Sequence, residues 1–149
     1  MDPSAILDYS RVAVFADRQA GAYGAADPYP HAVIDEGLRP AAAEQALREF
    51  PSPESPGWTH WAHVNESKLG KTDRQAFPPA IGAIVDELQS WRFVAILTRL
   101  TGIEGLFPDD RLEGSGIHQS VRGGFLNVHA DFTVHPHHAA WQRRVNVLV

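Results

Sequence analysis

The hydrophobic pattern of this chain changes from helical to strand-like near Pro108, and that change limits the folds that the sequence can adopt. In two segments before Pro108, apolar residues recur at three- and four-residue intervals, the spacing of a helix with one buried face. From Gly116 onward, apolar residues alternate with polar ones or form short runs bounded by glycine, which is typical of strands. Helices followed by strands predict an α+β domain in which helices support an antiparallel sheet.

The two helical segments cover residues 40–50 and 79–102. The first begins with Pro40, which suits a first helical turn because its missing N–H would have no helical partner there. The apolar residues of the second are spaced for a helix that faces a core and ends at Gly102. The sequence leaves open whether Ser90 divides this second segment into two helices.

Six further segments have the composition of short strands. They are residues 11–15, 31–35, 58–63, 116–121, 125–129 and 143–149. Arg122-Gly123-Gly124 predicts a hairpin turn between the fourth and fifth of them. The histidine-rich stretch at residues 135–138 contains a proline and shows no periodicity, so we interpret it as a surface loop.

Composition excludes several classes of protein. The 149 residues contain no cysteine, which excludes disulfides and thiolate metal sites and suits a reducing cytoplasm. Thirteen basic and 18 acidic residues give a net charge of -5, which argues against a nucleic-acid-binding face. No apolar run approaches the roughly 20 residues of a membrane span, and no secretory signal is evident. We therefore expect a cytoplasmic protein that binds neither nucleic acid nor membrane.

The sequence stops inside its most strand-like run, residues 143–149. An uncapped, apolar strand is a pairing hazard that natural domains avoid at their ends. We therefore expect 1–149 to be a single partial domain, with a mainly helical support region at 1–110 and the first strands of a sheet at 111–149. A missing C-terminal half, or assembly into a homo-oligomer, would cover the open strand.

The candidate site is His129-Ala130-Asp131. In an extended segment, residues i and i+2 point to the same side, so the His129 imidazole and the Asp131 carboxylate can converge on one metal ion. With a second histidine they would form the 2-His-1-carboxylate triad of non-haem Fe(II) enzymes. The tripeptide alone is a weak pattern, and a chance pairing of a strand-end histidine with a turn aspartate is the competing interpretation.

A wider set of segments closely resembles the Fe(II)/2-oxoglutarate-dependent oxygenases, in a bacterial branch related to the prolyl 4-hydroxylases. The matching segments are residues 28–35, 50–53, 65–70, 100–106, 116–132 and 143–149. The last carries the R-x-V-x-x-L part of a motif that continues with Tyr-Leu-Asn in the family. The resemblance implies a double-stranded β-helix, or jelly roll, with the N-terminal helices packed on it and only the opening strands present here.

The resemblance also implies an activity and its cofactors. The family hydroxylates small-molecule or peptidyl substrates with Fe(II), 2-oxoglutarate and O₂, and with ascorbate as an optional reductant. His129 and Asp131 match the first two iron ligands. The third ligand and the basic residue for the distal carboxylate of 2-oxoglutarate lie later in the family's sequence than residue 149, so the chain alone is expected to be inactive. Strand parity suggests Asn127, and Gln119 on the preceding strand, as residues near the cosubstrate.

The same residues are also compatible with two other functions. One is a non-catalytic jelly-roll binding module or pseudo-enzyme that no longer needs iron. The other is a zinc protein that uses His129, Asp131 and one of His135, His137 or His138. Pro136 makes the closed four-ligand geometry that zinc prefers awkward at that loop.

Overall fold

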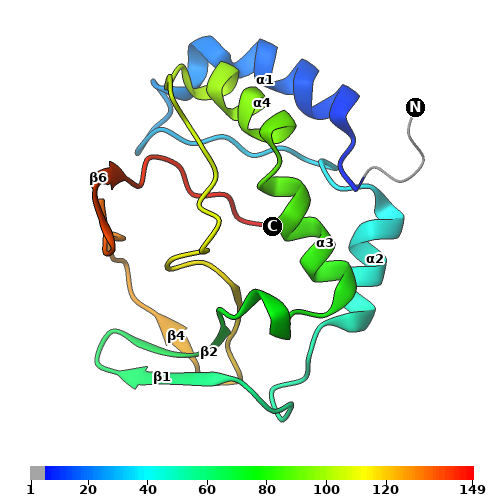
Figure 1. Ribbon diagram of the computed structural model, residues 1–149, viewed down its shortest axis with the longest axis vertical. Helices are drawn as coiled ribbons and strands as arrows, with labels where there is room; N and C mark the ends of the chain where they lie inside the picture. Colours follow the sequence, from blue (N-terminus) through cyan, green and yellow to red (C-terminus); the bar gives the residue numbers. More distant parts are fainter. Residues whose placement is uncertain (1–5) are drawn as a thin grey trace. The chain divides into compact units, whose positions relative to one another are not determined.

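The structure is a computed structural model that describes residues 6–149, and its mixture of helices and antiparallel strands confirms the predicted α+β class. The chain divides into two compact units (Figure 1). The described part of the first unit comprises residues 6–50 and Pro78–Asp110, and the second comprises Pro51–Phe77 and Arg111–Val149. One junction between the units thus follows Asp110, where the hydrophobic pattern changes. In residues 6–149, no helix is both long and apolar enough to cross a membrane.

The described part of the first unit is helical. Its helices are α1 (Tyr9–Tyr23), α2 (Pro40–Glu49), α3 (Pro79–Leu88) and α4 (Trp91–Thr101). Figure 1 shows α1 beside α4, and α2 beside α3, within this unit. The buried core cluster consists of Leu7, Tyr9, Val12, Ala16, Phe93, Ile96 and Leu100. Helices α1 and α4 therefore supply most of the core of the first unit.

Helix α1 replaces the strand predicted at residues 11–15, so that prediction is wrong. The Asp8 carboxylate accepts a hydrogen bond from the Arg11 amide at 3.1 Å, which caps the first turn. Tyr9, Val12 and Ala16 are all buried, and their spacing places them on one helical face. Residues 11–15 alone resemble a strand, but the buried face of the helix includes Tyr9 before them and Ala16 after them.

The other helix predictions are confirmed, and the structure decides the question at Ser90. Its hydroxyl oxygen accepts a hydrogen bond from the Phe93 amide at 3.2 Å, so Ser90 caps a separate helix α4. Gly102 ends that helix with a left-handed φ of 69°. Helix α2 occupies the predicted place. Its predicted apolar stripe is not buried: no residue of α2 is buried, and Leu47 is 78% exposed.

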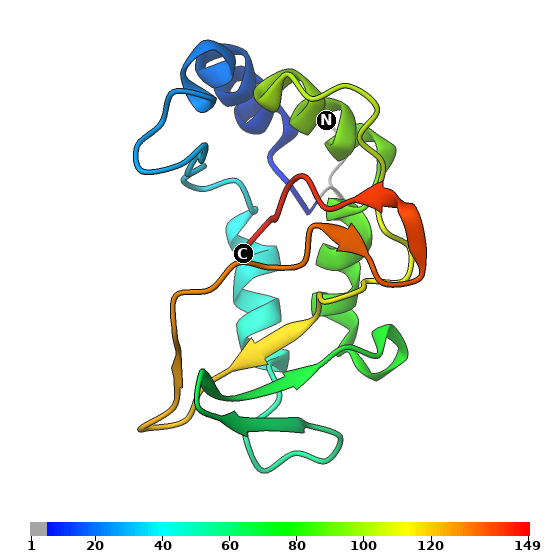
Figure 2. The same ribbon diagram turned by 90° about the vertical axis from the view of Figure 1, so that its left-hand side faces the viewer.

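The second unit is built around strand β2 (Glu66–Lys71). Its antiparallel partners are β1 (Thr59–His63), β3 (Ile117–Gln119) and β4 (Phe125–Leu126). In Figure 2 the green β2 lies between β1 and the yellow β3. Because β1 pairs along one edge of β2, strands β3 and β4 share the other edge one after the other. They are not paired with each other in the described sheet, although the predicted turn lies between them.

The strand predictions are thus only partly confirmed. Residues 58–63 correspond to β1, and the segments 116–121 and 125–129 each contain a shorter strand. Residues 31–35 and 143–149 have no regular strand. A hairpin instead forms from β5 (Val134–His135) and β6 (His138–Gln142), across the stretch interpreted as a loop. Strand formation depends on a pairing partner, which the composition of a single segment does not reveal.

The Tyr9 side chain gives the first unit a predicted pH dependence. Its hydroxyl donates to Glu87 Oε1 at 2.5 Å, and burial followed by this hydrogen bond raises the pKa of Tyr9 above its ordinary value of 10.0. Above about pH 10 the unfolded chain loses the Tyr9 proton, whereas the native protein still keeps it. The free energy of unfolding therefore falls as pH rises above about 10. Urea unfolding from about pH 9 to about pH 11 should show a shallower loss of stability for Tyr9→Phe than for the parent. Equal slopes would contradict this assignment.

Candidate metal centre

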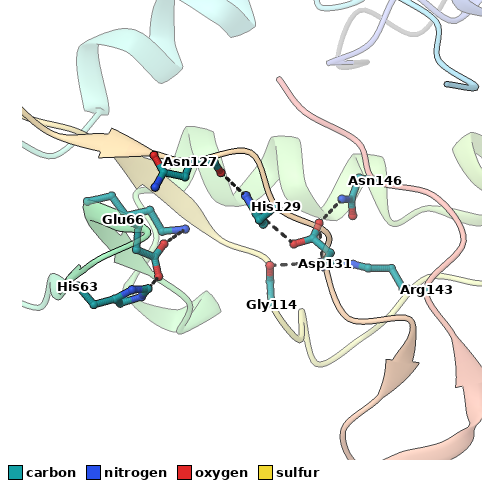
Figure 3. A network of polar contacts seen from close by, with 9 residues as sticks. His63, Glu66, Gly114, Asn127, His129, Asp131, Arg143 and Asn146 are labelled. Atoms are coloured by element: carbon teal, nitrogen blue, oxygen red, sulfur yellow. Dashed lines mark hydrogen bonds and ion pairs between the residues drawn. The ribbon is translucent and has the colours of Figure 1, made fainter. Parts of the chain in front are cut away.

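His129 and Asp131 lie in the second unit, directly after β4, in a segment without regular secondary structure. The strand predicted through residue 129 ends at Leu126. The two side chains nevertheless converge, with His129 Nε2 and Asp131 Oδ1 3.6 Å apart (Figure 3). They are 45% and 39% exposed, so a cation from solvent can reach both. The convergence expected from spacing is present, although the local chain is not a regular strand.

The orientation of the His129 ring suits a metal ligand. Its Nδ1 lies 2.8 Å from the Asn127 carbonyl oxygen. Because a carbonyl oxygen can only accept, Nδ1 donates to it. This tautomer leaves Nε2, the nitrogen that faces Asp131, as the atom that can bind a cation. Metal-binding histidines commonly have this arrangement, in which a second group fixes the tautomer and the ring orientation.

Two residues absent from the sequence-based site prediction hold the Asp131 carboxylate. Asn146 Nδ2 donates to Asp131 Oδ2 at 2.5 Å, and Arg143 Nη1 lies 3.2 Å from the same oxygen. We call Arg143 and Asn146 the Asp131 bracket (Figure 3). Both residues come from the predicted strand at 143–149, where their polar character among apolar neighbours was the available signal.

The predicted cosubstrate residues, Asn127 and Gln119, both bond to backbone carbonyls. Asn127 Nδ2 donates to the Val64 oxygen at 3.3 Å, and Gln119 Nε2 donates to the Pro51 oxygen at 3.1 Å. Asn127 touches His129 through its carbonyl oxygen rather than its side chain. Both amides tie segments of the second unit together, and their role beside 2-oxoglutarate stays a prediction.

A separate ion-pair group lies on β1 and β2. Glu66 accepts from Lys68 Nζ at 2.7 Å. It also contacts His63 Nε2 at 2.8 Å (Figure 3). The hydrogen bond from Lys68 and then that from His63 lower the pKa of Glu66, so this carboxylate stays ionised. On β3, burial lowers the pKa of His118, whose ring packs edge-on against Trp61. In Figure 3 the drawn contact of His63 is with Glu66, and neither residue is joined to Asp131.

The histidines at 135–138 are not an entirely solvated loop, so that interpretation is wrong for His135. Only 6% of His135 is exposed, and its ring packs against Phe132 and Trp141 at centroid distances of 6.4 and 5.4 Å. These rings form a small aromatic cluster beside the paired strands β5 and β6. His137 is exposed, and its Nε2 lies 3.6 Å from Glu113 Oε2.

The described side chains bring two potential metal donors together, those of His129 and Asp131. Within residues 6–149, no group of three or more His, Asp or Glu side chains lies close enough to hold a metal ion. The donor set of His129 and Asp131 thus fits two of the three positions of a facial triad. Comparison of the chain with protein-family models, curated proteins and solved structures finds no match.

Proposed function

We propose that this chain carries two iron ligands of an Fe(II)/2-oxoglutarate-dependent dioxygenase that hydroxylates a small-molecule or peptidyl substrate. The observation that carries the proposal is the approach of His129 Nε2 to Asp131 Oδ1 on an exposed surface. The wider sequence resemblance supports the same class. We include in the proposal the double-stranded β-helix, of which the sheet around β2 would form the beginning.

The residues of this chain have three tasks in the proposed enzyme. His129 and Asp131 bind the metal, the Asn127 carbonyl orients the imidazole, and the Asp131 bracket holds the carboxylate. The bound Fe(II), with 2-oxoglutarate and O₂, supplies the oxidising power for hydroxylation of a C–H bond. A third protein ligand would come from outside residues 6–149, either from a longer protein or from a second chain.

Chemical rescue tests this proposal on the chain as it exists. Free imidazole can occupy the position of an absent histidine ligand, so we expect it to strengthen Fe(II) binding at His129 and Asp131. Under anaerobic conditions, Fe(II), 2-oxoglutarate and imidazole should together produce the visible charge-transfer absorption of a chelated 2-oxo acid. His129→Ala and Asp131→Ala should each reduce that absorption by at least about tenfold, because each removes one ligand.

His137→Ala is the matched control, because His137 is an exposed histidine of the same unit outside the proposed site. It should give the parent absorption. An absorption that is equal in the parent and His129→Ala would come from Fe(II) complexes in solution and would overturn the proposal. A parent protein that gives no absorption at saturating imidazole would also overturn it.

A second candidate function is a jelly-roll binding module or pseudo-enzyme without iron. In such a module, the contacts of Asp131 with His129, Arg143 and Asn146 would have a purely structural role. Asp131→Ala separates the two functions once a ligand is known. A binding module should keep its ligand after this change, whereas the dioxygenase half-site should lose its metal.

A further inference from the structure

The two oxygens of Asp131 have different surroundings. Both donors of the Asp131 bracket meet Oδ2, Asn146 at 2.5 Å and Arg143 at 3.2 Å. The other oxygen, Oδ1, is the atom that faces His129 Nε2. In the contacts drawn in Figure 3, the bracket and the imidazole lie on opposite sides of the carboxylate. The carboxylate therefore has one oxygen tied to the protein and one directed at the imidazole.

Arg143 is itself held from several directions. Its Nη2 donates to the Gly114 carbonyl oxygen at 3.2 Å, and its guanidinium carbon lies 4.5 Å from the centre of the Phe132 ring. Its backbone amide donates to the Thr133 oxygen at 2.9 Å. Only 16% of the Arg143 side chain is exposed. A guanidinium held in this way presents Nη1 to Asp131 in a single direction.

Gly114 makes this arrangement possible. Its φ is +66°, and a Cβ there would lie 2.8 Å from Phe132 Cε1 and 3.3 Å from Arg143 Nη2. Any side chain at residue 114 would therefore push against both the ring and the guanidinium. Without a side chain at residue 114, this backbone can approach Arg143, which contacts Asp131 on its other nitrogen.

We propose that Arg143 and Asn146 are positioning residues that hold Asp131 by Oδ2, so that only Oδ1 binds a divalent cation shared with His129. This inference rests on the proposed function. A carboxylate that binds through one oxygen occupies one coordination position and leaves the others open for a chelating cosubstrate. Without the bracket, Asp131 is free to rotate or to bind through both oxygens. The alternative is a purely structural role, in which the bracket only ties residues 143–146 to the segment around Asp131.

The experiment uses Mn²⁺ as the probe, because its paramagnetism broadens nearby NMR signals even when binding is weak. The measured quantity is the Mn²⁺ concentration that half-broadens the backbone amides of residues 129–131. Asn146→Ala removes a donor without changing charge, and Arg143→Lys keeps the charge but loses the fork. We expect each to raise that concentration by about tenfold, the usual size of such effects on metal affinity.

Arg144→Lys is the matched control, because Arg144 is exposed and its side chain contacts Gln142 at 3.4 Å. It should leave the Mn²⁺ concentration unchanged, and His129→Ala should abolish the selective broadening. Amide spectra without metal show whether each variant is folded. Asn146 is exposed, so Asn146→Ala decides the test if Arg143→Lys does not fold.

A second, metal-free measurement examines the bracket directly. Asp131→Asn should shift the side-chain NH signals of both Arg143 and Asn146 in ¹⁵N spectra, whereas Arg144 signals should not move. Unshifted Arg143 and Asn146 signals would overturn the inference.

The possible results separate the inference from the proposed function. If His129→Ala abolishes broadening but Asn146→Ala and Arg143→Lys behave as the parent, the positioning role is overturned and the metal site stands. If the parent shows no broadening that depends on His129, both are overturned. Weaker Mn²⁺ binding in both bracket variants, with a normal control, supports both.

Discussion

Replacing Gly116 by alanine is expected to lower the free energy of unfolding of the second unit by about 3 kcal/mol. Gly116 precedes β3 and has a φ of +151°, which residues with a side chain rarely adopt. An added Cβ would lie 2.2 Å from the Lys71 carbonyl oxygen and 3.2 Å from Thr72 Cα. These are backbone atoms at the end of β2, so relief would require the pairing of Lys71 with Ile117 to open.

Gly123→Ala is the matched control for this prediction. Gly123 also has a positive φ, +86°, but a Cβ there meets nothing within 4 Å. It should therefore cost only the backbone strain, about 1 kcal/mol. Urea unfolding followed through amide signals of β2 and β3 measures both changes. Equal losses in the two variants would show that the contact with Lys71 is not what requires glycine at residue 116.

The second large effect is expected for Phe93→Ala in the first unit. Phe93 is 4% exposed on α4 and belongs to the cluster that includes Val12 and Ala16 of α1. Removing its ring deletes buried apolar area and leaves a cavity between two helices, which should cost about 4 kcal/mol. Thermal unfolding followed by circular dichroism should show an early loss of helical signal.

Trp91→Ala provides the control on the same helix. Trp91 is also aromatic, but 67% of it is exposed, so its removal should cost about 0.5 kcal/mol or less. A loss of stability as large as that of Phe93→Ala would mean that the exposed ring makes a contact in solution that this packing does not contain.

The helices show how far local sequence reaches in this protein. The predictions at 40–50 and 79–102 needed only spacing, a starting proline and a terminal glycine, and the structure has helices at both places. A helix closes its hydrogen bonds within its own segment, so its signals are local. The error at residues 11–15 arose because that stretch was considered without Asp8 and Ala16, which lie just outside it.

In the candidate site too, contacts between near neighbours in sequence could be predicted, whereas contacts between distant residues could not. His129 and Asp131 are near neighbours in the sequence, and their spacing was enough to predict that they converge. The contacts of Arg143 and Asn146 with Asp131 do not follow from sequence spacing, because the chain passes through the β5–β6 hairpin between them. In that part of the chain His135 also packs against Phe132 and Trp141, which are three and six residues away from it in sequence.

The sequence by itself determined the α+β class, the positions of α2, α3 and α4, and the convergence of His129 with Asp131, because each depends on groups that are close along the chain. Only the tertiary structure decided which apolar runs became strands. Residues 143–149 are the most strand-like in composition yet have no regular strand, whereas β2, which no periodicity indicated, is the centre of its sheet. A strand is stabilised by partners that are distant in sequence, so pairing outweighs the preference of any single segment.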